Sequence, residues 1–168
     1  MAATTVFYGS IRGIQSLTEK VIELDTALVS LQRVMNLPEH KFNEMLEQSI
    51  QNVDALSAKT KDYLQIVGDF GRTGLNDQES LAMANTATLL QNISDMTADE
   101  SFNALTTALI AFNMQAEESI RVADRLNEID NNYAITSRDL ALSLAKSAST
   151  AKTFNVTLDE LLGYTTAW

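Results

Sequence analysis

The sequence of 168 residues contains no cysteine, a single proline and few aromatic side chains, which make up 7% of the chain. Without cysteine the chain has no disulfide framework, thiolate zinc site or thiol nucleophile, so several classes of enzyme and secreted domain are excluded. Basic residues are also scarce, since 12 Lys and Arg stand against 22 Asp and Glu, for a formal net charge of -10. Because proteins that bind the phosphate backbone concentrate Lys and Arg, stable nucleic-acid binding is not expected.

Hydrophobic residues account for 45% of the chain, which is enough to bury a core. The first residues lack the basic start and apolar run of a signal peptide, and we expect no export signal. No charge-free stretch reaches the roughly 20 apolar residues that a membrane-spanning helix needs. Residues 165–168 follow a helix-start signal with no Gly, Lys or Arg to close the helix, so we expect truncation at the C-terminus of a longer chain.

One proline, six glycines and no alternating apolar and polar run predict an all-α fold. From residue 14 the apolar positions alternate at intervals of three and four, as in a coiled coil. This pattern predicts one long helix that ends at Asn36-Leu37-Pro38, because proline cannot continue the helical hydrogen-bond ladder. We expect its apolar stripe to form a helix-packing or self-association surface, and a homo-oligomer through the N-terminal helices. The stripe residues are Ile14, Leu17, Val21, Leu24, Leu28 and Leu31.

A second helix is predicted from Pro38 to residue 67. Only Lys20 and Asp25 form an oppositely charged pair beside the first stripe, so an antiparallel hairpin is favoured over a free coiled coil. Three glycines at residues 68, 71 and 74 then predict a joint. We therefore expect residues 1–67 to form a long helical hairpin or coiled-coil arm, and residues 68–168 to form a compact multi-helix bundle.

Four helix starts in the later half have a capping box or a close variant of it. In this motif the side chain of the cap residue and a carboxylate three residues later each accept a hydrogen bond from the backbone N–H of the other residue. The interval from Asn76 to Thr97 equals that from Thr136 to Thr157, and this equality is a weak indication that a pair of helices has been duplicated. A further helix is predicted over residues 116–130, ended by Asn131-Asn132 in a left-handed conformation. The four pairs are Asn76 with Glu79, Thr97 with Glu100, Thr136 with Asp139, and Thr157 with Glu160.

The inventory of reactive groups is poor, and we expect no catalytic residue, cofactor or metal site. His40, the one histidine, lies in the turn after Pro38, where a solvated side chain is expected. The glycine series lacks the Gly-Lys-Ser/Thr of a phosphate loop. The polar run at residues 127–132 lacks the ligand spacing of a calcium loop. An acid/base hydrolase would need a cleft that joins Asp99, Glu100 or Asp124 to Asp159.

The later half contains specific motifs. The run Leu126-Asn127-Glu128-x-x-Asn131-Asn132-Tyr133 is followed by Ser137-x-Asp139-Leu140-Ala141. Phe112-Asn113-Met114 precedes these runs, and the stretch at residues 157–167 follows them. From about residue 70 to residue 168 the sequence resembles the core region of phage tail tape measure proteins, and the Asn-Asn-Tyr run is the most specific part of the resemblance.

The resemblance implies a non-enzymatic structural segment of a tailed-phage or prophage tail, made in the host bacterial cytoplasm. Such proteins occupy the lumen of the tail tube, set tail length, and leave through the tip during genome ejection. The implied partners are the tail tube protein, tail assembly chaperones and tail-tip proteins. The alternative is a generic helical adaptor or a secreted helical-hairpin interaction protein. Because a ruler works by extension, we expect residues 10–67 to be rod-like and residues 68–168 to be a folded module.

Overall fold

The computed structural model describes residues 22–94 and 96–166. All regular structure in these two ranges is helical, which confirms the predicted all-α class. No helix there has both the length and the apolar character required to cross a bilayer. The helices are residues 22–35, α2 (Glu39–Leu56), α3 (Thr60–Arg72), α4 (Asp77–Ile93), α5 (Ala98–Phe112), the short 3-10 helix η1 (Ala116–Glu118), α6 (Ser119–Asn132), α7 (Ser137–Thr153) and α8 (Leu158–Thr166).

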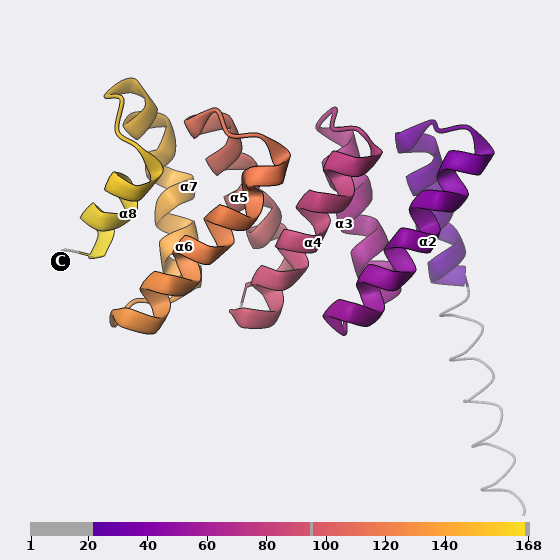
Figure 1. Ribbon diagram of the computed structural model, residues 1–168, viewed down its shortest axis with the longest axis horizontal. Helices are drawn as coiled ribbons and strands as arrows, with labels where there is room; N and C mark the ends of the chain where they lie inside the picture. Colours follow the sequence, from indigo (N-terminus) through magenta and orange to yellow (C-terminus); the bar gives the residue numbers. More distant parts are fainter. Residues whose placement is uncertain (1–21, 95, 167–168) are drawn as a thin grey trace, which may run out of the picture.

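The helices form an elongated array in two layers (Figure 1). One layer contains α2, α4, α6 and α8, and the other contains residues 22–35, α3, α5 and α7. Helices pack against their neighbours in sequence, and several also pack against the next helix of their own layer, as α2 does against α4, α4 against α6 and α5 against α7. The buried side chains form one cluster that extends from Leu31 to Leu162. The described chain is therefore a row of helical hairpins, where an arm followed by a compact bundle was predicted.

The turns at one edge of the array recur with a period of about 40 residues. Each of these four turns contains a residue with positive φ, between 46° and 96°. The next residue is apolar and packs partly buried against the core, and a helix begins shortly after it. The four pairs are Asn36-Leu37, Gly74-Leu75, Asn113-Met114 and Asn155-Val156.

The turns at the opposite edge follow the same period, with the helix caps Lys59, Thr97 and Thr136. Together the two edges define a hairpin unit of two helices and about 40 residues, as in other helical-repeat proteins. The duplication indicated by the sequence matches the helix start at Thr97 with the helix start at Thr157. These two residues are separated by about one and a half hairpin units. The duplication therefore pairs α4 with α7 and α5 with α8, which lie in different layers, and the predicted repeat unit is wrong.

The predicted second helix is in fact two helices. Ser57 adopts φ 53° and ends α2, and α3 begins at Thr60. Of the three glycines at the predicted joint, Gly74 lies in the turn at residues 73–76 with φ 96°, whereas Gly68 and Gly71 lie inside α3. A Cβ at Gly71 would collide with the Met35 sulfur, whereas a Cβ at Gly68 would lie at an ordinary 3.6 Å from the Leu31 Cδ1, so Gly71 is the glycine that allows residues 22–35 to approach closely. The predicted boundary between residues 67 and 68 therefore lies within a helix.

The four predicted helix starts are confirmed. The Asn76 N–H donates to Glu79 Oε2 at 2.8 Å, and the Glu79 N–H donates to Asn76 Oδ1 at 3.0 Å. Thr97 with Glu100 and Thr157 with Glu160 form the same reciprocal pairs, whereas the Asp139 carboxylate accepts from the Thr136 hydroxyl. Since these bonds satisfy amides that the first helical turn leaves unpaired, they fix where the helices begin.

Candidate functional site

The structure describes half of the predicted self-association stripe. Ile14, Leu17 and Val21 lie outside the described residues. Leu31 is 1% exposed, and Leu24 and Leu28 pack partly buried against the same core. The described half of the stripe therefore faces the chain's own helices, because α3 brings its glycines against it. A further role of the stripe in self-association stays a prediction.

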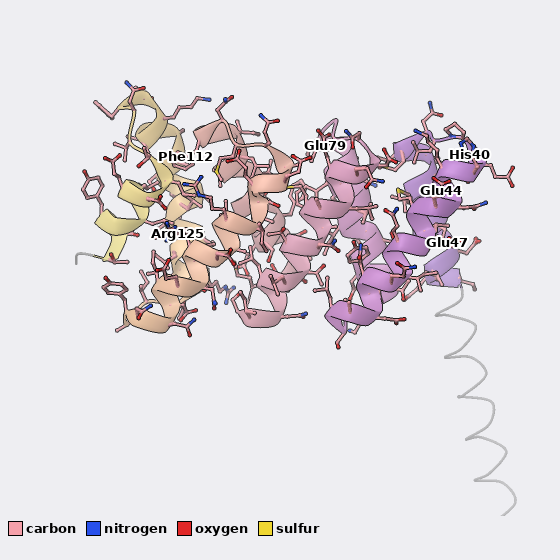
Figure 2. The ribbon with its side chains drawn as sticks, in the orientation of Figure 1. His40, Glu44, Glu47, Glu79, Phe112 and Arg125 are labelled. Carbon is pink, nitrogen blue, oxygen red and sulfur yellow. The ribbon has the colours of Figure 1, made fainter. Side chains whose placement is uncertain are left out.

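A network of ion pairs joins α6 to the start of α8. The Arg125 Nε lies 3.0 Å from Asp159 Oδ1, and another nitrogen of the same guanidinium lies 2.6 Å from Glu128 Oε2. The Arg121 guanidinium lies 3.6 Å from Asp159 and 3.9 Å from Glu118. Figure 2 places Arg125 between the two helices. The cluster thus contains five residues: Glu118 of η1, Arg121, Arg125 and Glu128 of α6, and Asp159 of α8.

The electrostatics of this network follow from its geometry. The hydrogen bond to Glu128 and the nearby Asp159 carboxylate raise the pKa of the Arg125 guanidinium above its ordinary value. The side chains are largely exposed and their charges are screened by solvent, so the pairs contribute little to the stability of the fold. The network therefore orients α8 against α6 more than it stabilises the fold.

A shallow groove of about 660 Å³ lies beside the network, between α6 and α8. Its lining includes Arg125, Glu128, Asn132, Tyr133 and Asp159. Most of these residues belong to the runs that carry the resemblance to tail proteins. Residues of the runs that resemble tail proteins therefore line a groove at the surface, and we take this groove as the candidate functional site.

The Asn-Asn-Tyr run builds the corner next to the groove. The Asn131 and Asn132 Nδ2 atoms donate to the carbonyl oxygens of Asn127 and Glu128 at 2.8 and 2.6 Å, within α6. The predicted left-handed Asn conformation is wrong, since α6 extends through Asn132. These side-chain bonds to the last turn end the helix without a left-handed residue.

The same corner also holds the start of α7. The Ser137 N–H donates to Asp130 Oδ2 at 2.8 Å, and the Ser137 hydroxyl, which is buried, donates to the Leu126 carbonyl at 3.3 Å. The motif residues thus serve as turn-forming and cap-forming groups between two helices. The side chains of Asp130, Asn131, Asn132 and Ser137 all bond to backbone groups of the corner, which is typical of a structural motif.

Two of the four carboxylates considered for acid/base chemistry take part in ion pairs. Glu100 accepts two bonds from the Arg138 guanidinium, at 2.7 and 3.1 Å, and also caps α5. The bond from Arg138 is the largest cause that lowers the pKa of the Glu100 carboxyl. Asp159 belongs to the α6–α8 network, so these two acids take part in separate ion pairs.

The single histidine of the sequence lies on α2, near two glutamates. His40, Glu44 and Glu47 project from the exposed side of α2 at the far end of the array (Figure 2). Within residues 22–94 and 96–166, no group of three or more His, Asp or Glu side chains is arranged to hold a metal ion. No sequence pattern indicates the pairing of Arg121 and Arg125 with Asp159, because Asp159 lies more than thirty residues away along the chain.

Comparison with known proteins identifies the family. The model of the phage-related minor tail protein family matches residues 50–167, from the middle of α2 to the end of α8. The matched part contains the corner motif, the ion-pair network and the groove. No solved structure matches the chain. Because the match covers well over half of the sequence, the chain belongs to the phage-related minor tail protein family.

Proposed function

We propose that this chain is a structural segment of a tail tape measure protein, which acts inside the tail tube in tail assembly, length determination and genome ejection. Its partners in this role are the tail tube protein, the tail assembly chaperones and the tail-tip proteins. The chain acts by helix packing and has no reactive centre. The observation that carries the proposal is the tape-measure-like Asn-Asn-Tyr run, which forms the corner between α6 and α7 inside the matched region.

The charge of the chain supports a place in the tube lumen. A net charge of -10 opposes binding to the DNA that passes through the same tube. The exposed surfaces of the described helices carry most of the acidic side chains, such as Glu44 and Glu47 on α2. A lumenal protein with this charge would not retain the genome during ejection.

The hairpin array constrains how such a protein could measure length. Residues 22–67 form parts of three antiparallel helices, where a rod was predicted. One hairpin unit drawn out as a continuous helix would span about 58 Å, at about 1.5 Å for each residue. Folded as a hairpin, the unit adds only about 10 Å, the spacing of packed helices. The length that each unit adds to the tail therefore differs several-fold between the extended and the folded state.

The test changes the number of units in the phage or prophage gene and measures tails by electron microscopy. Deletion of residues 76–114 removes α4 and α5 and joins Leu75 to Gln115, the cap of the next equivalent turn. Tails should shorten by about 58 Å if the unit is extended in the tube, and by about 10 Å if it stays folded. Duplication of the same residues should lengthen tails by the same amount.

The matched control is Ile110→Ser, which changes an exposed side chain in the duplicated segment and should leave tail length unchanged. Tails of unchanged length from both the deletion and the duplication would contradict the proposal. The chain would then be a tail protein of another kind, or the helical adaptor considered above.

A further inference from the structure

Helix α4 lies in the middle of the array and is buried on most of its sides. It packs against α2, α3, α5 and α6. Within residues 80–90, only Ala82, Asn85 and Leu89 are not buried. Their spacing of three and four places them on one face of the helix, and Ile93, which is 39% exposed, continues that face. These four residues, the α4 stripe, form the outer face of α4 in its layer.

The α4 stripe carries no charge. The acidic residues of α4 are confined to its first turn, and residues 80–94 contain no charged side chain. A helix at a protein surface normally turns charged or strongly polar side chains toward water. An outer face with Ala, Leu and Ile is instead typical of a surface that a partner covers. Because α2 and α6 flank α4 on both sides, this surface does not arise from the start or the end of the sequence.

Exposed carboxylates lie on both helices that flank the stripe. Glu44, Glu47 and Asp54 are exposed on α2, and Figure 2 labels the first two of them. Glu117 of η1 and Asp124 of α6 are exposed on the other side. None of these five acids forms an ion pair with another residue that the structure describes. The stripe is therefore an uncharged surface between two acidic ones.

Nearby cations do not neutralise the two acidic flanks. Helix α2 holds four acidic residues and one lysine, and η1 together with α6 holds five acidic residues and two arginines. The formal charge of each flank is therefore -3. Both arginines, Arg121 and Arg125, also pair with Asp159 of α8, on the side of α6 away from α4.

A helix fits this surface in both shape and charge. A helix with its side chains is about 10–12 Å wide, and packed neighbours lie about 10 Å apart. A helix laid along α4 would therefore have one side above α2 and the other above α6. We infer that the α4 stripe binds a basic amphipathic helix of another protein. Its apolar face contacts Ala82, Leu89 and Ile93, and its Lys or Arg side chains approach the carboxylates of α2 and α6.

Charge disfavours a second copy of this chain as the occupant. The chain has a net charge of -10, and two α4 stripes facing each other would bring four acidic flanks together. Among the described helices, only α7 holds more basic than acidic residues, and its apolar side chains belong to the core. A second copy therefore offers no free basic helix among the described residues. The inference does not depend on a role of the chain in tail length.

The test measures the binding of a fluorescent synthetic helix to the full chain by anisotropy. The peptide is as long as α4, with Leu and Ala at three-four spacing on one face and Lys on both sides of that face. Wild type should bind it, and added salt should weaken the binding because it screens the charges. Leu89→Lys places a like charge in the middle of the contact and should lower the affinity by about tenfold or more. Ile93→Lys, a second variant of the stripe, should also lower it.

The matched control is Ile110→Lys. Ile110 is 67% exposed on α5, which lies in the other layer, and the substitution changes the net charge by the same amount as Leu89→Lys. This variant should bind the peptide nearly as well as wild type. A peptide with Glu in place of Lys should not bind to wild type, and circular dichroism verifies that every variant keeps its helices.

The acidic flanks are tested with a second matched pair. Glu47→Gln combined with Asp124→Asn removes one charge from each flank and should weaken binding several-fold. Asp62→Asn combined with Asp99→Asn removes two exposed charges from α3 and α5, in the other layer, and should have a smaller effect.

Three results would overturn the inference. The first is wild type that does not bind the Lys peptide at concentrations up to about 1 mM. The second is an equal loss of affinity in Leu89→Lys and Ile110→Lys, which would show attraction to the overall charge alone. The third is self-association of wild type that Leu89→Lys abolishes and Ile110→Lys does not, since a second copy would then occupy the stripe.

Discussion

The Tyr63 hydroxyl donates a hydrogen bond of 2.7 Å to Asn85 Oδ1, and it accepts one of 2.9 Å from Asn52 Nδ2. These three residues come from α3, α4 and α2, so the hydroxyl connects the two layers of the array. Tyr63 is 1% exposed. A buried hydroxyl costs free energy unless it is paired, and here both of its bonding capacities are used.

Tyr63→Phe should lower the free energy of unfolding by about 1–2 kcal/mol, because it leaves the Asn52 and Asn85 amides without this partner. Urea denaturation measures the change, and the slope of the transition should stay constant. Tyr164→Phe, which removes an exposed hydroxyl, should have almost no effect. Equal stabilities of wild type and Tyr63→Phe would show that the buried bonds contribute nothing net.

Alkaline pH should destabilise wild type through the same residue. Burial raises the pKa of Tyr63 from 10.0 to about 12, so the unfolded chain releases this proton first. The contribution to stability is complete below pH 10 and is lost as the pH rises toward 12, by at most about 1.4 kcal/mol per pH unit. Unfolding curves at several alkaline pH values should show this loss in wild type and a smaller one in Tyr63→Phe. Parallel curves would contradict the raised pKa.

The two glycines of α3 should respond differently to alanine. Gly68→Ala adds a methyl at ordinary contact distance from Leu31, and it should stabilise the chain by about 0.5–1 kcal/mol because alanine favours the helix. Gly71→Ala would place its methyl against the Met35 sulfur, which must move. Thermal unfolding should therefore rank Gly68→Ala above Gly71→Ala. Met35→Ala combined with Gly71→Ala should recover stability relative to Met35→Ala alone, and failure to do so would contradict the contact.

Acid should remove the contribution of Glu100. Its pKa is lowered, chiefly by the bond from Arg138, so the stabilisation is present above the ordinary carboxyl pKa and is lost as the pH falls through the lowered value. Glu100→Gln keeps a capping side chain and loses the charge. Wild type should be more stable than Glu100→Gln at neutral pH, and the difference should vanish in acid. Glu79→Gln, at a cap with no arginine partner among the described residues, is the control and should show a smaller change with pH.

The helix starts of the later half could be predicted because their signal is local. A cap side chain and a carboxylate three residues on lie within one turn, so the sequence contains the whole interaction. The starts of α2 and α3 have no such signal, since Pro38 and Lys59 make no side-chain cap bond. For this reason the break after Ser57 was missed and two helices were predicted as one.

The candidate site could be predicted only in part. The Asn-Asn-Tyr run identified the region by resemblance, and the comparison confirms a tail family. The function of its side chains at the corner was not predicted, because Ser137 meets Asp130 and Leu126 only after the chain reverses. The pairing of Arg125 with Asp159 depends in the same way on tertiary structure, because α7 packs against both α6 and α8 and brings Asp159 within reach of α6.

The sequence by itself determined the helical class, four of the helix starts and the tail-protein family, because composition, capping and motifs are read along a single stretch of chain. Only the tertiary structure decided that the described helices form a row of hairpins with a period of about 40 residues. The period is not visible as repeated residues, since caps as different as Pro38, Asn76 and Gln115 occupy one position. What repeats is burial and chain reversal, and these exist only once the helices have packed against each other.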